Sequence, residues 1–409
     1  MELANHQIDH LKALAAKRNL RYQAIVPGLR GEGDDRGYLN PILFDGARDG
    51  FSLLDIGSNL GYFCLEASAR GAGNVVGVDP DPSNIELAGE IARIAGSKAS
   101  YLEGQFEDLE FEPASFDVVA CLNVLHHMYN PIQALHKMMS VTSHKVVLEF
   151  AAPNYRDMVS GAITPLGWLA RNQAAIFLGR SRFFSDGSRT FMFPREAVRI
   201  LFNEHTALFE PVRFTRSPFK GRWIAEAVRR RIGHLVLVAG PTSVGKSTFQ
   251  TSLERDEKLR EQVGIAKDAR ITFCNANLLG LPTGKIDTLV VHYDMLRPHL
   301  SSIKSYERDI PLQILIAADE VTSLALVADE KILQDRITKH ELSRFFVKKR
   351  HRRIFEDYAN PNFLPSFYTE WTTFCDQHEN LTNSLVVKTD AQGGYAISKL
   401  DSRNPPWRR

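Results

Sequence analysis

Short apolar runs alternate with amphipathic stretches along the first half of the chain, and this pattern predicts strands that alternate with helices. Runs at Phe51–Ile56, Asn74–Val78 and Phe116–Leu122 are bounded by glycine or polar clusters, as expected for buried strands. A helical segment, Tyr62–Arg70, separates the first two runs, and Lys145–Phe150 supplies a further strand. The order is typical of an α/β fold with a largely parallel sheet.

Glycines and carboxylates follow the ends of the first two predicted strands. The first strand runs into the segment Asp55-Ile-Gly57-Ser-Asn59-Leu-Gly61, and the second closes with Asp79. Glycine lets the backbone approach a ligand closely, and a carboxylate at the second strand end can accept hydrogen bonds from ribose hydroxyls. This βαβ unit therefore predicts a ligand that contains adenosine.

Polar residues also follow the remaining strand ends of the first half. Gln105 and Phe106 come after a short strand at Ser100–Glu103, and Asn123 follows the strand that ends at Leu122. From about Leu53 to Phe150 the chain resembles the class I S-adenosylmethionine-dependent methyltransferases. An NAD-dependent dehydrogenase is the competing interpretation of the βαβ unit, but the sequence at the fourth strand has no place in it.

The resemblance implies a set of residues that bind S-adenosylmethionine. They are Asp55, Gly57, Asn59, Gly61, Asp79, Gln105, Phe106 and Asn123. The first glycine loop would surround the methionine part, Asp79 would bind the ribose, Gln105 and Phe106 would lie at the adenine, and Asn123 would line the cofactor floor. Two positions depart from the family pattern, because Asn59 replaces a common glycine and Gln105 replaces a usual Asp. The carbonyl of Gln105 can still pair with an adenine amino group.

Two adjacent histidines are candidates for the proton transfer that methylation of a hydroxyl requires. Imidazole titrates near neutral pH, so His126 or His127 could act as the base. We expect His127 to face the substrate, whereas His126 fits a packing role equally well. Glu149 is a second candidate base, and a solvated strand terminus is the alternative interpretation of its position.

The segment 151–189 breaks the alternation of strands and helices. It carries several aromatic residues and arginines, which suit a sugar, a phosphate or a nucleotide, so we predict a lid over the methyl-acceptor site. A helical hairpin with core aromatics is the alternative. Pro194–His205 reads as a helix, and Pro211–Ser217 with Arg222–Val228 resembles the antiparallel strand pair that closes methyltransferase sheets. The first domain is therefore expected to span 1–232.

The second half opens with an apolar strand and a glycine loop of spacing G-x-x-x-x-G-K-S. Lys246 can reach the β- and γ-phosphates of a nucleotide, and the hydroxyl of Ser247 can hold Mg²⁺. A predicted helix, Lys246–Arg255, would direct its positive end at the same phosphates. The segment predicts an ATP site whose residues are Gly240, Gly245, Lys246, Ser247 and Thr248.

Two later segments favour a kinase. Leu289–Tyr293 is an apolar strand that runs into Asp294, which is placed to hold Mg²⁺ or to take a proton from the phosphate acceptor. A basic run then offers Arg344, Lys348 and Arg350 as a lid that closes over the triphosphate, although a solvated helix face is the usual interpretation of such a run. From Gly233 onward the chain resembles the P-loop small-molecule kinases. A GTPase is the rival, but Val387 stands where its guanine-reading motif requires Asn.

Composition narrows the partners. The chain has 409 residues and a net charge of +2, so it offers no global attraction for nucleic acid, which is disfavoured as a partner without being excluded. No apolar run is long enough to span a membrane, and the four scattered cysteines fit a reducing cytoplasm.

The sequence therefore predicts two doubly wound α/β domains, 1–232 and 233–409. We expect a bifunctional enzyme that methylates, at oxygen, and phosphorylates a small metabolite or a saccharide terminus, with S-adenosylmethionine, ATP and Mg²⁺ as cofactors. The first half somewhat resembles the methyltransferase domain of enzymes that cap bacterial polysaccharides, and also the tRNA wobble-uridine methyltransferases. The alternative is a methyltransferase for tRNA or a metabolite whose second domain is a nucleotide-dependent switch.

Overall fold

The computed structural model separates the chain into two compact units. It describes residues 4–17, 24–26, 29–30, 35–154, 159, 164–169, 172–180, 189–203, 208–241, 243–275, 281–292, 314–315, 317–342, 360, 362–377 and 381–401. Unit 1 comprises Met1–Glu204 with Pro211–Arg229, and unit 2 comprises His205–Glu210 with Arg230–Arg409. Among the described residues, no helix is both long and apolar enough to cross a bilayer.

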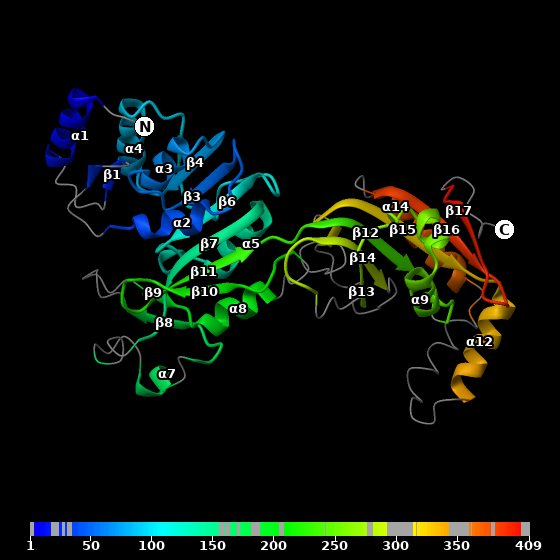
Figure 1. Ribbon diagram of the computed structural model, residues 1–409. Helices are drawn as coiled ribbons and strands as arrows, with labels where there is room; N and C mark the ends of the chain where they lie inside the picture. Colours follow the sequence, from blue (N-terminus) through cyan, green and yellow to red (C-terminus); the bar gives the residue numbers. More distant parts are fainter. Residues whose placement is uncertain are drawn as a thin grey trace. The chain divides into compact units, whose positions relative to one another are not determined.

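Unit 1 is built on a seven-stranded sheet with the order β10-β11-β7-β6-β3-β4-β5 (Figure 1). Its strands are β3 (Ser52–Ile56), β4 (Asn74–Asp79), β5 (Ser100–Glu103), β6 (Phe116–Leu122), β7 (Thr142–Ala151), β10 (Arg213–Arg216) and β11 (Arg222–Val228). The strands from β3 to β7 pair in parallel, and β11 runs antiparallel to both β7 and β10. The carboxyl ends of all five parallel strands therefore lie at one edge of the sheet.

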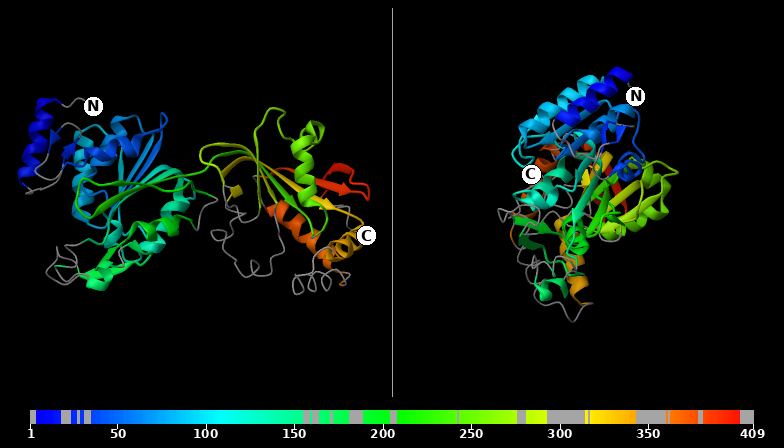
Figure 2. Two further views of the ribbon diagram at one scale, coloured as in Figure 1. Left: turned by 60° about the horizontal axis from the view of Figure 1, so that its bottom comes forward. Right: turned by 90° about the vertical axis from the view of Figure 1, so that its left-hand side faces the viewer.

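Helices cover the sheet of unit 1. They are α1 (Asn5–Lys17), η1 (Gly37–Leu39), α2 (Asn40–Phe44), α3 (Tyr62–Ala69), α4 (Pro82–Ile94), η2 (Leu125–His127), α5 (Pro131–Val141) and α8 (Arg195–Asn203). Leu43 of α2 and Phe63 of α3 pack with Leu53 and Val118 of the strands in one buried cluster. Helix α1 lies beside α4, where the side chain of Gln7 donates to the carbonyl of Ile94 (Figure 1 and Figure 2).

The sequence at the start of α4 determines where this helix begins at the carboxyl edge of the sheet. The Asp81 side chain caps the helix by accepting from the amide of Ser83, and Pro82 occupies its first turn. The cap lies two residues after Asp79, so the helix begins at the same edge of the sheet at which β4 ends.

Only parts of the segment predicted as a lid lie within the described residues. They include α7 (Pro165–Leu169), β8 (Phe177–Arg180) and the first residue of β9 (Arg189–Met192). The pair β8–β9 is antiparallel and forms a sheet of its own, as does the pair β1 (Ala24–Val26) and β2 (Leu29–Arg30). The chain then returns to the main sheet, because the amide of Phe193 donates to the carbonyl of Ala151 at 2.9 Å.

Unit 2 contains a six-stranded sheet with the order β13-β14-β12-β15-β16-β17. The strands are β12 (Ile232–Ala239), β13 (Ile271–Asn275), β14 (Ile286–His292), β15 (Ala318–Val327), β16 (Leu381–Thr389) and β17 (Tyr395–Lys399). The first five pair in parallel, and β17 is antiparallel to β16. Strand β12 lies in the middle, so the glycine loop that follows it is at the centre of the carboxyl edge.

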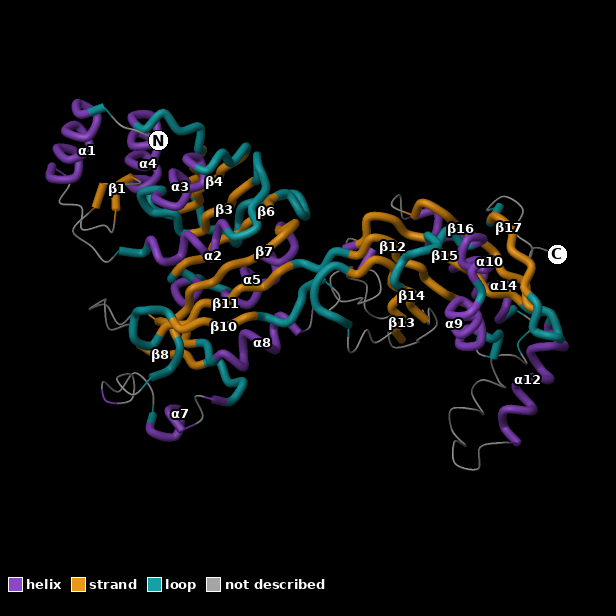
Figure 3. Tube along the Cα trace, viewed as in Figure 1, coloured by secondary structure: helices purple, strands orange, loops and turns teal. Residues whose placement is uncertain are grey.

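Helices of unit 2 lie against this sheet (Figure 3). They are α9 (Lys246–Arg255), α10 (Glu257–Gln262), α12 (Glu330–Leu342) and α14 (Phe363–Gln377). Helix α12 contacts the sheet near the beginning of the helix and then extends away from it (Figure 3). Phe249 of α9 and Leu333 of α12 are fully buried against Val238 and Leu326 of the strands. The sequence predicted the bounds of α9, and the beginning of β12 at Ile232 lies one residue before the expected domain boundary.

Candidate cofactor and active sites

The loop after β3 has the backbone conformation that its glycines suggested. Gly57 and Gly61 have φ angles of 72° and 77°, in the left-handed region where a side chain is strained. A Cβ atom on Gly57 would lie 2.3 Å from Val124, and one on Gly61 would lie 2.2 Å from the hydroxyl of Tyr101. Asn59 also has a positive φ of 49°, which Asn tolerates better than most residues, so its departure from the family pattern preserves the loop.

Asp79 connects this loop to α4. Its carboxylate accepts from the backbone amide of Asn59 at 2.9 Å, from the backbone amide of Asp81 at 3.0 Å and from the side chain of Asn84 at 3.1 Å. Only 6% of the residue is exposed. A carboxylate offers about four lone pairs to donors, so one remains for a further donor at this edge.

Asp55 lies at the end of β3, beneath the loop. Burial, together with the neighbouring charge of Asp79, raises the pKa of Asp55 to about 7. The thiol of Cys64, 3.8 Å away, is its hydrogen-bond donor. An ionised Asp55 is therefore poorly compensated by the protein, and a bound cation would stabilise it.

The residues expected at the adenine differ in their surroundings. Gln105 is exposed, whereas Phe106 is buried, stacks on Phe111 with ring centroids 6.0 Å apart, and lies beneath the ammonium group of Lys137. The adenine contact that the sequence assigned to both residues would therefore depend mainly on Gln105.

Several buried polar atoms at the same edge lack hydrogen-bond partners within the described part of the chain. They include the side-chain oxygens of Asn123 and Ser58 and Nδ1 of His126. Asn123 follows β6 with a φ of 66°, and its amide donates to the carbonyl of Glu149 at 2.7 Å. Buried polar atoms usually have partners, so these atoms fit a site that a polar ligand completes.

The two histidines form part of η2, next to Asn123. Their ring centroids are 4.0 Å apart. His126 is buried, and burial together with the charge of His127 lowers its pKa to about 3, so that it stays neutral. Desolvation and the charge of Arg222 also lower the pKa of His127, whose side chain remains partly exposed. Of the two, His127 is the one that a substrate could reach in its neutral, basic form.

Glu149 is fully buried near the end of β7, so the alternative interpretation of this residue as a solvated strand terminus was wrong. Its carboxylate accepts from the hydroxyl of Tyr38 at 2.5 Å, from the hydroxyl of Ser217 at 2.6 Å and from the guanidinium of Arg36 at 3.0 Å. Burial and the bond to Glu149 raise the pKa of Tyr38 above its usual value. Sequence reasoning missed these three partners, because they lie 68 to 113 positions away.

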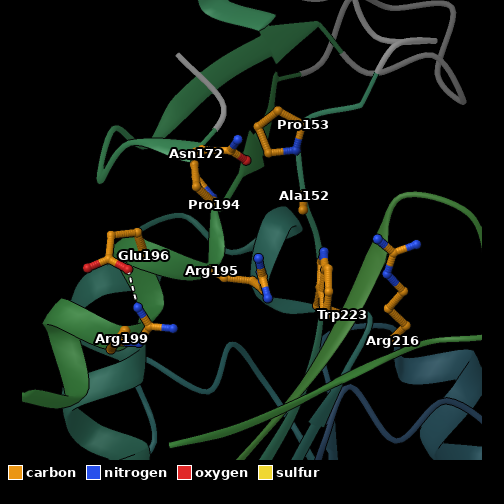
Figure 4. Close-up of a pocket in the computed structure, with 9 residues that line it drawn as sticks. All are labelled: Ala152, Pro153, Asn172, Pro194, Arg195, Glu196, Arg199, Arg216 and Trp223. Carbon is orange, nitrogen blue, oxygen red and sulfur yellow. Dashed lines mark hydrogen bonds and ion pairs between the residues drawn. The ribbon is translucent and has the colours of Figure 1, made fainter. Parts of the chain in front are cut away.

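A cleft of about 380 Å³ opens beyond the end of β7 (Figure 4). Its lining comes from the residues after β7, from α8 and from strands β10 and β11: Ala152, Pro153, Asn172, Pro194, Arg195, Glu196, Arg199, Arg216 and Trp223. The ring of Trp223 lies between Arg195 and Arg216, whose guanidinium carbons are 4.1 and 5.3 Å from the ring centroid. The sequence analysis did not identify this arginine and tryptophan cluster.

The glycine loop of unit 2 lies between β12 and α9. Gly240 and Gly245 have φ angles of 151° and 105°. The ammonium group of Lys246 donates to the carbonyls of Gly240 at 2.5 Å and Pro241 at 3.0 Å, while Ser247 and Thr248 are exposed in the first turn of α9. The loop, its buried lysine and the free first turn of a helix together fit a phosphate chain.

Arg336 of α12 is a further cation beside this loop that the sequence analysis missed. Its guanidinium donates to the carbonyl of Val244 at 2.9 Å and to the carbonyl of Asp390 at 2.9 Å. The remaining sequence candidates, Asp294, Arg344, Lys348 and Arg350, lie outside the described residues. Within the described part of the chain, no group of His, Cys, Asp and Glu side chains could hold a metal ion.

Comparison with known proteins identifies the family of the central part of unit 1. Residues 54–148 match a family model described as a methyltransferase domain. A ubiquinone biosynthesis O-methyltransferase of Methylocella silvestris is 29% identical over 175 residues, which cover 43% of this chain and 65% of that relative. Another of the same name, from Azorhizobium caulinodans, is 32% identical over 30% of this chain and 50% of its own length.

A solved structure, the magnesium protoporphyrin IX methyltransferase of Synechocystis PCC 6803 with bound SAH, is 19% identical. It covers 47% of this chain and 80% of its own, with a TM-score of 0.35. The chain spans less than two thirds of the length of each of the two O-methyltransferases described above. On the family match, the N-terminal part contains a class I S-adenosylmethionine-dependent methyltransferase domain.

Proposed function

We propose that unit 1 transfers the methyl group of S-adenosylmethionine to an oxygen atom of a small molecule or a saccharide terminus, and that unit 2 phosphorylates an acceptor with ATP and Mg²⁺. The observation that carries the first half is the bonding of Asp79. Three donors from the loop and α4 fix its carboxylate in place, and the lone pair that remains suits a ribose hydroxyl.

The neighbouring residues suit the rest of the cofactor. When bound, S-adenosylmethionine supplies a methyl group on a positively charged sulfur. Asp55, buried and without a cationic partner among its recorded contacts, would be stabilised in its ionised form by the positive charge of the methionine part. The unpartnered oxygens of Asn123 and Ser58 could accept or donate the polar contacts that the cofactor brings.

In this proposal His127 removes the proton from the acceptor. Its lowered pKa keeps the imidazole neutral near pH 7, and its partial exposure gives an acceptor access to it. We propose a positioning role for Glu149 in place of the role as base, because Tyr38, Ser217 and Arg36 already occupy its carboxylate. The names of the relatives, which are O-methyltransferases, favour oxygen as the methylated atom.

The kinase half rests on the position of the glycine loop. The loop follows the central strand β12, and Lys246 and Ser247 lie at the beginning of α9 beneath it. Lys246 would leave the loop carbonyls to contact the β- and γ-phosphates, and Ser247 would hold Mg²⁺. Asp294 would complete the metal site or take the proton of the phosphate acceptor, and Arg344, Lys348 and Arg350 would close over the triphosphate.

The competing function of unit 2 is a nucleotide-dependent switch that regulates methylation. A kinase and a switch are distinguished by measuring ADP release from the full chain in the presence of candidate small-molecule acceptors. A kinase releases ADP in proportion to phosphorylated acceptor, and the Lys246→Ala variant should lose this activity. The control variant Lys267→Ala should retain it, because Lys267 is an exposed lysine that pairs with Glu257. Nucleotide binding that alters methyl transfer without any acceptor-dependent ADP release would favour the switch.

The methyltransferase half is tested by calorimetry of the full chain with S-adenosylmethionine and by transfer of its labelled methyl group to a panel of hydroxylated metabolites. Saturable binding of one cofactor per chain and labelled ether products are expected. A folded chain that binds no S-adenosylmethionine would refute this half of the proposal.

A further inference from the structure

The cleft beyond β7 is strongly cationic. Three guanidinium groups, from Arg195, Arg199 and Arg216, line it against the single carboxylate of Glu196. Glu196 is bonded to Arg199, the pair joined by a dashed line in Figure 4. Among the described residues, the guanidinium groups of Arg195 and Arg216 form no hydrogen bond or ion pair and contact only the Trp223 ring. Two positive charges in the cleft are therefore without a neutralising partner in the described part of the protein.

Trp223 holds these two arginines in place. Cation–π contact on its ring restricts both side chains, so less conformational entropy is lost when they bind a ligand. Their N–H groups remain available, because stacking on an aromatic face uses none of the five guanidinium donors. Planar guanidinium groups with unused donors suit the oxygen atoms of a carboxylate or a phosphate.

The position of the cleft connects it to the methyl-transfer site. Ala152 and Pro153 follow β7 directly, and Trp223 pairs with Phe150 near the end of that strand. β7 is the neighbour of β6, whose end leads to Asn123 and the two histidines. In parallel α/β sheets, ligands bind outside the carboxyl ends of the strands, and the cleft lies at this edge.

We propose that the cleft binds an oxyanion group, a phosphate or a carboxylate, on the methyl acceptor of unit 1. The inference rests on the proposed methyl transfer and adds the chemical class of the acceptor. Arg195 and Arg216 contact the anion, whereas the charge of Arg199, one turn further along α8, is balanced by Glu196. The volume of about 380 Å³ suits a small metabolite or the end of a longer molecule, since ligand pockets usually measure about 300–1,000 Å³.

The cleft offers its own spectroscopic probe. The chain contains four tryptophans, so 5-fluorotryptophan labelling of the full chain gives a ¹⁹F spectrum in which Trp223→Phe identifies the signal of the cleft. Phenyl phosphate, benzoate and neutral benzyl alcohol are titrated in turn, with S-adenosylhomocysteine at saturation. Both anions should shift the Trp223 signal saturably, and benzyl alcohol should not. The anion that binds more tightly distinguishes a phosphate from a carboxylate acceptor.

Variants on one strand provide a matched control. Arg216→Gln and Arg195→Gln should each weaken anion binding about tenfold or more, since each removes a charge-assisted hydrogen-bond donor. Arg213→Gln should leave binding unchanged, because Arg213 lies on the same strand β10 but forms an ion pair with Glu226 and does not line the cleft.

Three results would overturn the inference: equal binding of benzyl alcohol, no binding of either anion, or equal weakening by Arg213→Gln and Arg216→Gln. Calorimetry with S-adenosylhomocysteine on the same samples separates the two proposals. A chain that binds S-adenosylhomocysteine but no anion contradicts the inference alone. A chain that binds the anions but no S-adenosylhomocysteine contradicts methyl transfer and leaves the oxyanion site standing.

Discussion

Replacement of Asp79 by Asn tests the cofactor site most directly. The two side chains have nearly the same shape, but an amide offers one acceptor oxygen where the carboxylate has two. In the structure, one carboxylate oxygen accepts from Asn59, and the other accepts from Asp81 and Asn84. Whichever way the amide is turned, its NH₂ group meets at least one of these donors, so at least one bond is lost.

The expected magnitude follows from these bonds. A hydrogen bond to a charged group contributes about 1.5–3 kcal/mol, and about 1.4 kcal/mol corresponds to a tenfold change in affinity. The variant also loses the charged acceptor for the ribose hydroxyls. We therefore expect Asp79→Asn to weaken S-adenosylmethionine binding by about tenfold to one hundredfold, measured by calorimetry.

Asp117 provides a matched control at the opposite edge of the sheet. Its carboxylate also accepts from a backbone amide, that of Ser52 at 2.9 Å, and pairs with Arg48 at 2.8 Å. It lies at the beginning of β6, away from the carboxyl ends of the strands. Asp117→Asn should lower the thermal unfolding temperature but leave cofactor affinity unchanged. Equal losses of affinity in the two variants, or none in a folded Asp79→Asn protein, would refute the assignment.

Two further predictions concern titratable groups at the same edge. The pKa of Asp55 is raised to about 7, so the folded protein keeps a proton on Asp55 that the unfolded chain releases above about pH 4. Without cofactor, the contribution of Asp55 to the free energy of unfolding should therefore fall as pH rises from about 4 to 7. The fall should be up to about 1.4 kcal/mol per pH unit. Urea denaturation at several pH values across this range should show this pH dependence of stability, and the Asp55→Asn variant should lack it. If His127 is the base, as proposed, His127→Gln should lower kcat for methyl transfer by about 10²- to 10⁴-fold and leave cofactor affinity unchanged. Rapid quench measures kcat and calorimetry measures the affinity. An unchanged kcat would exclude His127 as the base.

The parts of the fold that sequence reasoning predicted are those with a local signal. The helix α9 follows from the spacing of Gly245 and Lys246, and the loop after β3 follows from Gly57 and Gly61, because a backbone conformation at one position restricts the residue there. Strands β13 and β17 were not predicted. Ile271–Asn275 is short, and β17 begins directly after the pair Gly393 and Gly394, which forms part of the turn of a hairpin with β16.

The parts that it missed depend on contacts between distant segments. Glu149 reads locally as the end of a strand, and only the fold brings Tyr38 and Ser217 to its carboxylate. The arginine cleft is similar, because Arg195 begins a helix and Arg216 ends a strand, and each alone resembles a solvated charge. A common binding role for Arg195 and Arg216 can be inferred only from the fold, in which both contact the ring of Trp223. No periodicity or spacing along the chain encodes such a cluster.

The two proposals together imply an order of reactions. If the oxyanion in the cleft is a phosphate, a phosphorylating unit 2 supplies the group by which unit 1 recognises its acceptor, so phosphorylation precedes methylation. In the proposed kinase, Lys246→Ala would remove the positive charge at the β- and γ-phosphates and should abolish phosphoryl transfer. Given the unphosphorylated acceptor, this variant should also lose methyl transfer, and it should regain methyl transfer when the phosphorylated acceptor is supplied. Lys267→Ala should perform both reactions from either starting point, since its lysine pairs with Glu257 on the surface. Methylation of the unphosphorylated acceptor by Lys246→Ala at the unaltered rate would show that the anion in the cleft is not the product of unit 2, because a unit that needed that product could not proceed without it.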